Sequence, residues 1–386
     1  MIKLIKRELE KDVKLWIKSK EIIAIRGTRQ SGKTTFLKII KDILIEDNVK
    51  NSNIHFISFE DDFEKEKFEK NPKEYIKFFI GGNADKEFFL LDEVQYIKNA
   101  GKLLKLIYDE FENVKIFITG SSTLDLNEVS SFLVGRGLLF EMHPFSFAEF
   151  LEAKDEKLFR YYSEKRINFN GIKSISSKPL FLEDLNRYLI EYVTFGGYPA
   201  IVLENNYEKK KILLKNLFLT YVEKDITKVY GLKYKQRVSD LIKHLASINS
   251  SILNYNEIAK SIGFYDKEVK EVLSILEQTY IIKLIKPFYR NMTTELRKNP
   301  KVYFMDLGLR NFISGRFDFN NEELGKILEN YTLNTLINKK VNYWRTAAKA
   351  EVDFIVNESL PIESKLNVKI TRSLRSFIET YKINLA

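Results

Sequence analysis

The feature that most constrains the fold is a glycine motif near the start of the chain. Residues 27–34 read Gly-Thr-Arg-Gln-Ser-Gly-Lys-Thr, which has the Gly-x-x-x-x-Gly-Lys-Thr spacing of a phosphate-binding loop. An apolar, β-branched stretch at 21–26 precedes the motif, and a stretch with helical spacing at 35–41 follows it. Strand, glycine loop and helix is the context that the motif requires. The sequence therefore predicts a strand–loop–helix unit that binds a nucleotide through its phosphates.

The residue types in this loop suit phosphate chemistry. Glycines let successive backbone N–H groups point at one anion, and the N-terminus of the following helix adds its positive end. We expect the Lys33 amine to reach the β- and γ-phosphates of ATP and the Thr34 hydroxyl to bind Mg²⁺. The predicted nucleotide-binding residues are Gly27, Thr28, Arg29, Gln30, Ser31, Gly32, Lys33, Thr34 and Thr35, together with Asp92.

Apolar strand candidates alternate with helical stretches over the first 150 residues. After the strand at 21–26, they lie at 54–59, 88–91, 116–119 and 138–142. Strands that alternate with helices predict a parallel sheet with helices on both faces, which is an α/β fold. Apolar residues at helical spacing also predict an amphipathic helix over 2–17.

The strand candidate at 88–91 ends in two acids, Asp92 and Glu93. A buried strand needs no acids at its tip for stability, so the pair predicts a site at the carboxyl edge of the sheet. We expect Asp92 to hold Mg²⁺ through water and Glu93 to activate the attacking water as general base. An ordinary polar strand end is the structural alternative.

Two further positions are candidates for the same chemistry. Thr119 or Ser121, at the end of the next strand candidate, could sense the γ-phosphate, although a turn rich in Gly and Ser would explain them equally well. Arg136 lies between two glycines and could serve as an arginine finger. A surface arginine in a turn is the alternative for Arg136.

Together these motifs resemble a family of prokaryotic, archaeal-type AAA+ ATPases that carry a C-terminal domain of unknown function. The resemblance spans nearly the whole chain and implies a five-stranded ATPase core with a helical lid, but no substrate. It rests on 27–34, Leu91–Gln95, Thr119–Ser122, Gly135–Arg136, Pro144–Phe150 and Phe195–Pro199.

A second pattern begins near residue 231. Three helices followed by a hairpin of 280–285 with 301–304 predict a winged helix-turn-helix. Residues 231–300 hold 12 Lys and Arg against 7 Asp and Glu, half of the net charge of +10. This basic excess favours DNA as a partner, although wing-type modules also serve as protein–protein spacers. The predicted nucleic-acid contacts are Lys267, Lys270, Lys283, Lys286 and Arg290.

The last eighty residues carry a third pattern. Strands are predicted at 342–345, 352–356 and 360–366, with Asp353 on the second strand and Glu363 and Lys365 on the third. This arrangement resembles the PD-(D/E)xK nuclease fold. The resemblance implies that Asp353 and Glu363 bind a second Mg²⁺ or Mn²⁺, that Lys365 orients or deprotonates water, and that Glu329 supplies a further acid. In the alternative, Asp353 and Lys365 form a cross-strand ion pair in an inactive copy.

The predicted architecture is therefore an ATPase core (1–150), a helical lid (151–230), a winged helix-turn-helix (231–305) and a small α/β nuclease-like domain (306–386). No cysteine is present, and no apolar run approaches the length of a membrane span, so we expect a cytoplasmic protein without a membrane partner. The leading hypothesis is an Mg²⁺-dependent ATPase that binds and processes DNA. The alternative is a nucleotide-switched scaffold for a protein partner; self-association as a homo-oligomer is left open.

Overall fold

The structure, a computed structural model, describes residues 4–81, 86–120, 134–165, 180–221, 235–289, 298–366 and 371–383. The chain divides into two compact units, residues 1–175 and 176–386. The predicted ATPase core lies in the first unit, and the basic and nuclease-like segments lie in the second.

A five-stranded parallel sheet forms the centre of the first unit, with strand order β2-β3-β4-β1-β5. All five predicted strands are confirmed. The strands are β1 (Ile22–Gly27), β2 (Ile54–Ser58), β3 (Glu87–Asp92), β4 (Val114–Gly120) and β5 (Gly137–Met142), and the helices are α1 (Glu10–Lys14), α2 (Lys33–Glu46), α3 (Asp62–Lys70), α4 (Pro72–Phe79), α5 (Ala100–Glu110), α7 (Phe147–Lys154) and α8 (Glu156–Lys165).

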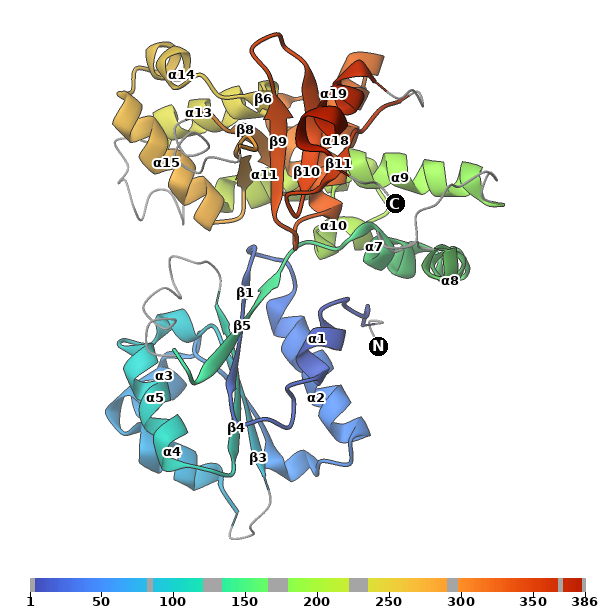
Figure 1. The fold of residues 1–386 in the computed structure, drawn as a ribbon. Coiled ribbons are helices and arrows are strands. Elements are labelled where there is room, and N and C mark those ends of the chain that lie inside the picture. Colours follow the sequence, from blue (N-terminus) through green and yellow to red (C-terminus); the bar gives the residue numbers. More distant parts are fainter. Residues whose placement is uncertain are drawn as a thin grey trace. The chain divides into compact units, whose positions relative to one another are not determined.

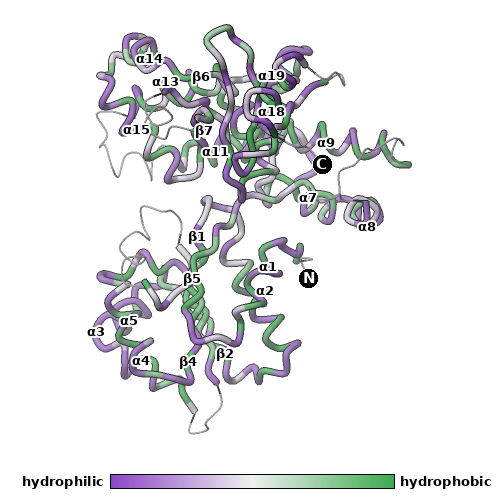
Figure 2. Tube along the Cα trace, in the orientation of Figure 1, coloured by the Kyte–Doolittle hydropathy of each residue, from purple (hydrophilic) through white to green (hydrophobic). Residues whose placement is uncertain are grey.

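Helices cover both faces of this sheet, as the alternating pattern predicted. In Figure 1, α1 and α2 lie on one side of the strands, and α3, α4 and α5 lie on the other. Each face has its own hydrophobic core, and the central strands are predominantly hydrophobic along their length (Figure 2). The predicted helix over 2–17 is shorter than expected, because α1 covers only Glu10–Lys14. The residues just before α1 make tertiary contacts with the phosphate loop, described below.

The second unit contains two small antiparallel sheets, with strand orders β6-β8-β7 and β11-β10-β9. The predicted pairing of 280–285 with 301–304 is confirmed by β7 and β8. The elements are α9 (Leu182–Phe195), α10 (Pro199–Leu203), α11 (Tyr207–Thr220), α13 (Lys235–Ser247), β6 (Ser251–Ile252), α14 (Tyr255–Ile262), α15 (Asp266–Gln278), β7 (Ile282–Ile285), β8 (Lys301–Phe304), α17 (Leu307–Ser314), α18 (Asn321–Thr335), β9 (Val341–Arg345), β10 (Glu351–Val356), β11 (Leu360–Ile362) and α19 (Arg372–Tyr381).

One hydrophobic core runs through most of the second unit. Buried side chains from α9, α11, α13–α15, the β6–β8 sheet and α17 all belong to it. Residues on both sides of the predicted boundaries at 230 and 305 contribute to this core. The predicted lid is likewise divided, because α7 and α8 belong to the first unit and α9–α11 to the second. Periodicity along the chain does not reveal which amphipathic helices share a core.

The glycine run at 195–199 has a packing role in this core. Gly196 has a φ of 80°, and a Cβ atom there would lie 2.2 Å from Asp306 Oδ1. The Gly197 N–H donates to Asp306 Oδ2 at 2.8 Å, and Asp306 also caps α17 by accepting from Leu309 N. A Cβ atom on Gly308 would lie 2.0 Å from the carbonyl oxygen of Phe195. Backbone therefore meets backbone at the contact between α9 and α17.

Among the described residues, no helix combines the length and the apolar character needed to cross a membrane.

Candidate functional site

The phosphate loop joins β1 to α2 at the carboxyl edge of the sheet. Gly27 has a φ of 151°, and a Cβ atom there would lie 2.0 Å from the carbonyl oxygen of Met142 at the end of β5. Gly32 has a φ of 91° and forms the N-cap of α2. Only glycine fits both positions without strain, because one lacks space and the other needs a left-handed backbone. The two glycines of the motif therefore set the path of the loop.

The interior of the loop has the polar groups that a phosphate would need. The Thr28 and Ser31 hydroxyl oxygens are buried, and neither has a hydrogen-bond partner among the described residues. Buried polar atoms are rarely left without a partner. The Lys33 amine is also buried and donates to the carbonyl oxygens of Thr28 at 2.9 Å and Gly27 at 3.2 Å. A charged lysine and two buried hydroxyls fit an anion with several oxygens.

The remaining loop residues are more open. Gln30 is exposed and takes a left-handed φ of 57°, Thr35 is exposed, and Arg29 is half-buried. The fold therefore places only the buried residues of the predicted nucleotide-binding set around the interior of the loop.

The predicted Mg²⁺ ligands meet beside the loop. Asp92, at the end of β3, is buried and accepts a hydrogen bond from the Thr34 hydroxyl at 2.8 Å on one oxygen. Its other oxygen accepts from the Thr119 hydroxyl. A carboxylate and a hydroxyl side by side suit a hard cation such as Mg²⁺, which prefers oxygen ligands. Thr119 therefore orients Asp92 rather than pointing freely at a phosphate.

Glu93 has the environment of a general base. Its backbone is left-handed, with a φ of 57°, and its N–H donates to the Thr119 hydroxyl at 3.0 Å. This uncommon backbone conformation for a non-glycine residue turns the chain sharply after the strand. Burial raises the pKa of Glu93, and a hydrogen bond from the Gln95 amide partly opposes that shift. A raised pKa brings a carboxylate closer to the working range of a base at neutral pH.

A buried ion pair between Arg7 and Glu149 supports the phosphate loop, and the sequence pattern did not indicate this pair. Arg7 donates to the carbonyl oxygens of Ser31 at 2.8 Å and His143 at 2.6 Å, and its Nε lies 3.0 Å from Glu149 Oε1. Glu149 also closes a capping box with Ser146 at the start of α7. Only that Ser-x-x-Glu spacing was readable from the sequence.

Two predicted site residues do not join this cluster. Ser121 lies outside the described residues. Arg136 precedes β5, whose first residue pairs with Ile22 at the start of β1, so Arg136 lies at the amino edge of the sheet. With a rise of about 3.3 Å per residue, the strand separates it from the loop by roughly 17 Å. Arg136 instead forms an ion pair with Asp109 at 2.9 Å, so it does not join the cluster around the loop of its own chain, and its role as an arginine finger stays a prediction.

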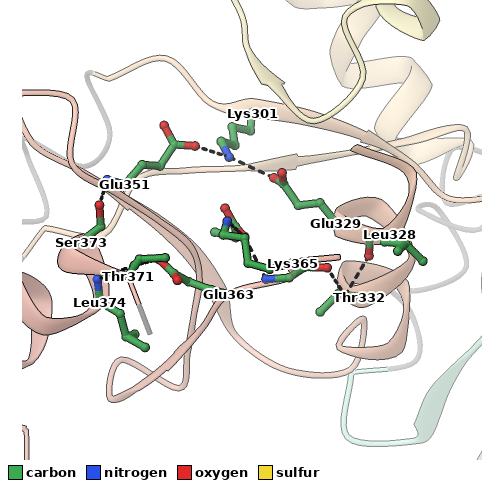
Figure 3. A network of polar contacts seen from close by, with 12 residues as sticks. Lys301, Leu328, Glu329, Thr332, Glu351, Glu363, Lys365, Thr371, Ser373 and Leu374 are labelled. Carbon is green, nitrogen blue, oxygen red and sulfur yellow. Dashed lines mark hydrogen bonds and ion pairs between the residues drawn. The ribbon is translucent and has the colours of Figure 1, made fainter. Parts of the chain in front are cut away.

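In the second unit, a buried lysine lies at the centre of the C-terminal acids. Figure 3 shows the Lys301 amine between the carboxylates of Glu329 and Glu351, at 3.0 Å and 2.6 Å. The Tyr303 hydroxyl donates to Glu329 at 2.6 Å. Burial alone would lower the pKa of Lys301, but the two carboxylates raise it overall. Lys301, which the sequence analysis did not select, therefore supplies a fixed positive charge to these acids.

The other predicted nuclease residues have partners of their own. Asp353, on β10, accepts from the Lys365 amine and from the Ser364 N–H, both at 2.9 Å. Glu363 accepts from the Thr371 hydroxyl at 2.6 Å. Because β11 ends at Ile362, Glu363 and Lys365 follow the strand instead of lying on it, contrary to the predicted strand over 360–366.

The second metal site predicted from Glu329, Asp353 and Glu363 is not formed in this structure. Among the residues described, no three His, Cys, Asp or Glu side chains come together as a metal-binding group. The physical reason is charge pairing: Glu329 is neutralised by Lys301, and Asp353 by Lys365. The ion pair of the alternative is present between Asp353 and Lys365, but it is not a cross-strand pair because Lys365 follows β11.

The predicted nucleic-acid lysines are all exposed or half-buried. Lys267 and Lys270 lie on α15, each within 4.0 Å of an acid one turn away. Lys283 lies on β7, 3.7 Å from Glu277. Lys286 follows β7 and has no ion pair with any described residue, while Arg290 lies outside the described residues.

Comparison with known families agrees with the geometry of the first unit. Residues 19–151 match the family described as "AAA domain". The similarity to an AAA domain therefore lies within the first unit. Residues 186–320 match a second family, described as "Domain of unknown function (DUF8612)". The first match ends within α7, so the phosphate loop, Asp92 and Glu93 all fall inside it.

Similar curated proteins share most of this chain but are themselves uncharacterised. One from Haemophilus influenzae is 25% identical over 347 residues, covering 88% of this chain and 80% of that protein. One from Methanocaldococcus jannaschii is 27% identical over 360 residues, covering 90% of this chain and 75% of that protein. Both matches extend over the two units of this chain.

Solved structures resemble the chain only distantly. The Orc1 protein of Aeropyrum pernix in complex with DNA has a TM-score of 0.31 and 13% identity, covering 81% of this chain and 94% of that one. AMPPCP-bound DnaA from Aquifex aeolicus has a TM-score of 0.30 and 17% identity, covering 72% and 89%. Similarity this low carries no functional argument.

Proposed function

We propose that this chain hydrolyses ATP with Mg²⁺ in its first unit and binds DNA through its second unit. The observation that carries the ATPase assignment is the meeting of Thr34, Asp92 and Glu93 at the phosphate loop. Mg²⁺, when bound, would neutralise charge that develops on the phosphate oxygens. Thr34 and Asp92 are the residues that would hold the ion, and Lys33 would supply a second positive charge.

Glu93 would act as the general base. It lies directly after the proposed metal-binding acid, and its fixed backbone turn aims its side chain from the same strand end. Its raised pKa favours accepting a proton from an attacking water. Thr119 would be a positioning residue, because it contacts both Asp92 and the Glu93 backbone.

The DNA assignment rests on the elements between residues 235 and 304. Their order is helix, short strand, helix, turn, helix and two antiparallel strands, which supports the interpretation as a winged helix. The basic excess in this segment supports a polyanionic partner. A protein partner, as in the scaffold alternative, would not require such an excess.

For the C-terminal acids we propose a structural role instead of DNA cleavage. Lys301 and Lys365 already neutralise three of the four carboxylates that lie closest to the nuclease pattern. A metal ion would have to displace those ammonium groups before it could bind. The cost of leaving a buried lysine unpaired would oppose that exchange.

One experiment tests the parts separately. We would compare wild type, Lys33→Ala and Asp353→Ala for ATP turnover, for DNA binding at low salt, and for Mg²⁺- or Mn²⁺-dependent DNA cleavage. We expect Lys33→Ala to abolish turnover, and we expect no cleavage by wild type above that of Asp353→Ala. Unchanged turnover in Lys33→Ala would refute the ATPase site. Cleavage that Asp353→Ala removes would refute the structural role. Absent DNA binding would favour the scaffold alternative.

A further inference from the structure

The second unit contains a basic groove of about 740 Å³ between its two small sheets. One wall comes from α15 and β7, and the other comes from the end of α18 and the start of β9. Of the acidic residues that the structure describes, Glu277 alone lines the groove. Its lysines are Lys270, Lys283, Lys286, Lys298, Lys339 and Lys340.

Half of these lysines lack a compensating charge. Lys286, Lys298 and Lys339 are exposed, and none forms an ion pair within the part of the chain that the structure describes. By contrast, Lys270 and Lys283 lie near Asp266 and Glu277, and Lys340 pairs with Glu358. Like charges in a concave surface focus a positive potential that attracts anions.

The two walls of the groove are fixed to one another by backbone contacts. The Lys286 carbonyl oxygen accepts from the Tyr343 N–H at 3.1 Å and from the Asn342 side chain at 3.3 Å. The Tyr343 hydroxyl donates to the Asn299 carbonyl oxygen at 2.8 Å. These contacts join the segment after β7 to β9, so the lysines of both walls are held on one rigid frame. Direct hydrogen bonds therefore hold the two walls of the groove together.

We propose that this groove holds the sugar–phosphate backbone of DNA. The inference rests on the proposed DNA binding and names where the backbone would lie. Lysines are compact point charges that suit several spaced phosphates, whereas bidentate recognition of one phosphate favours arginine. Among the described residues that line the groove, six are lysines and none is an arginine. Lys298, Lys339 and Lys340 thereby join the contact surface, while Lys267, a sequence-predicted contact, does not line it.

A charge-matched pair of triple variants tests the proposal. The groove variant is Lys286→Gln, Lys298→Gln and Lys339→Gln. The control variant is Lys215→Gln, Lys243→Gln and Lys260→Gln, which removes three exposed lysines from α11, α13 and α14 outside the groove. Each protein is titrated with a fluorescent DNA duplex between 50 and 200 mM salt. Thermal unfolding and ATP turnover, expected to be unchanged, check that the variants fold.

The expected result is asymmetric. The groove variant should lose about tenfold or more in duplex affinity, and its salt slope should fall by about three, because each lost phosphate contact removes close to one unit. The control variant should stay near wild type. An unchanged groove variant with a weakened control would overturn the groove while leaving DNA binding in place. No binding by wild type would instead overturn the proposed function itself.

Competition distinguishes DNA from other phosphate chains. An unlabelled duplex should displace the fluorescent duplex from wild type more strongly than inorganic polyphosphate at equal phosphate concentration, because the backbone spacing and the flanking surface also contribute. Equal displacement by polyphosphate would overturn the assignment to DNA.

Discussion

At the scale of single residues, the ATPase site depends on how a few polar side chains are constrained. Thr119 accepts a hydrogen bond from the Glu93 backbone and donates one to Asp92, so a single hydroxyl sets both acids. Arg7 supports the phosphate loop in a similar way, because it donates a hydrogen bond to the Ser31 carbonyl oxygen. Such supporting residues rarely touch a reactant, but they fix the geometry on which catalysis depends.

The pH dependence of ATP turnover should report on Glu93. Because burial raises its pKa, the acid limb of the pH profile should lie above the ordinary glutamate value of 4.5. Turnover requires the deprotonated base, so activity should rise as the pH passes this raised pKa. The Gln95→Ala variant removes the hydrogen bond that lowers the pKa, so its limb should move to still higher pH. Steady-state rates of ATP turnover from pH 5 to 9 measure the acid limbs of wild type and Gln95→Ala. An acid limb at lower pH in Gln95→Ala than in wild type would contradict the assignment of Glu93 as the base.

At the scale of elements, close packing explains motifs that carry no chemistry. The Gly196-Gly197 run and Gly308 allow α9 and α17 to meet backbone to backbone. From the sequence, a glycine run of this kind predicts a turn. In the fold it is a contact between segments more than a hundred residues apart.

Replacing Gly308 by alanine should destabilise the second unit. The new Cβ atom would lie 2.0 Å from the Phe195 carbonyl oxygen, which is backbone and cannot move aside cheaply. We expect a loss of about 1–3 kcal/mol or more in the free energy of unfolding. Gly325→Ala is the matched control: it lies in α18 with open space around it, and should stabilise by about 0.5–1 kcal/mol. Chemical denaturation measures both, and equal effects would contradict the close contact.

Removing the positive charge of Lys301 from between the C-terminal acids should also destabilise the second unit. Lys301→Met leaves Glu329 with only the neutral Tyr303 hydroxyl and Glu351 with Arg345 at 3.4 Å, and breaking a buried ion pair in this way costs about 3–5 kcal/mol. Adding Glu329→Gln and Glu351→Gln to the same chain should recover much of the loss. Denaturation midpoints measure the series. A triple variant as unstable as Lys301→Met would show that the lysine stem, rather than charge compensation, is what matters.

At the scale of the whole molecule, one chain joins an ATPase unit to a basic unit with a core of its own. Two ligands that bind to one protein can influence one another only through a coupling free energy, and that coupling is reciprocal. If ATP serves to control DNA binding, each ligand must change the affinity for the other by the same factor.

We therefore expect a non-hydrolysable ATP analogue to change the DNA affinity of wild type by about fivefold or more, as is typical of allosteric coupling. DNA should change the affinity for the analogue by an equal factor. The Lys33→Ala variant, which lacks the phosphate contact, should show no such change. Paired titrations of the two ligands give both factors. A factor of one in wild type would mean that the units work independently.

The sequence by itself determined the sheet of the first unit and the position of its candidate phosphate loop. The motif at 27–34, the strand periods and the Asp92–Glu93 pair indicated a parallel sheet and a nucleotide site, because strand alternation and backbone-turn requirements are local properties. Only the tertiary structure decided which distant charges meet. In the fold, Arg136 lies at the opposite edge of the sheet from the loop, and Arg7 contacts the loop backbone. Lys301 lies between two C-terminal acids, and lysines from two segments line one groove. Ion pairing between residues far apart leaves no periodic trace along a chain, which is why a pattern search cannot find it.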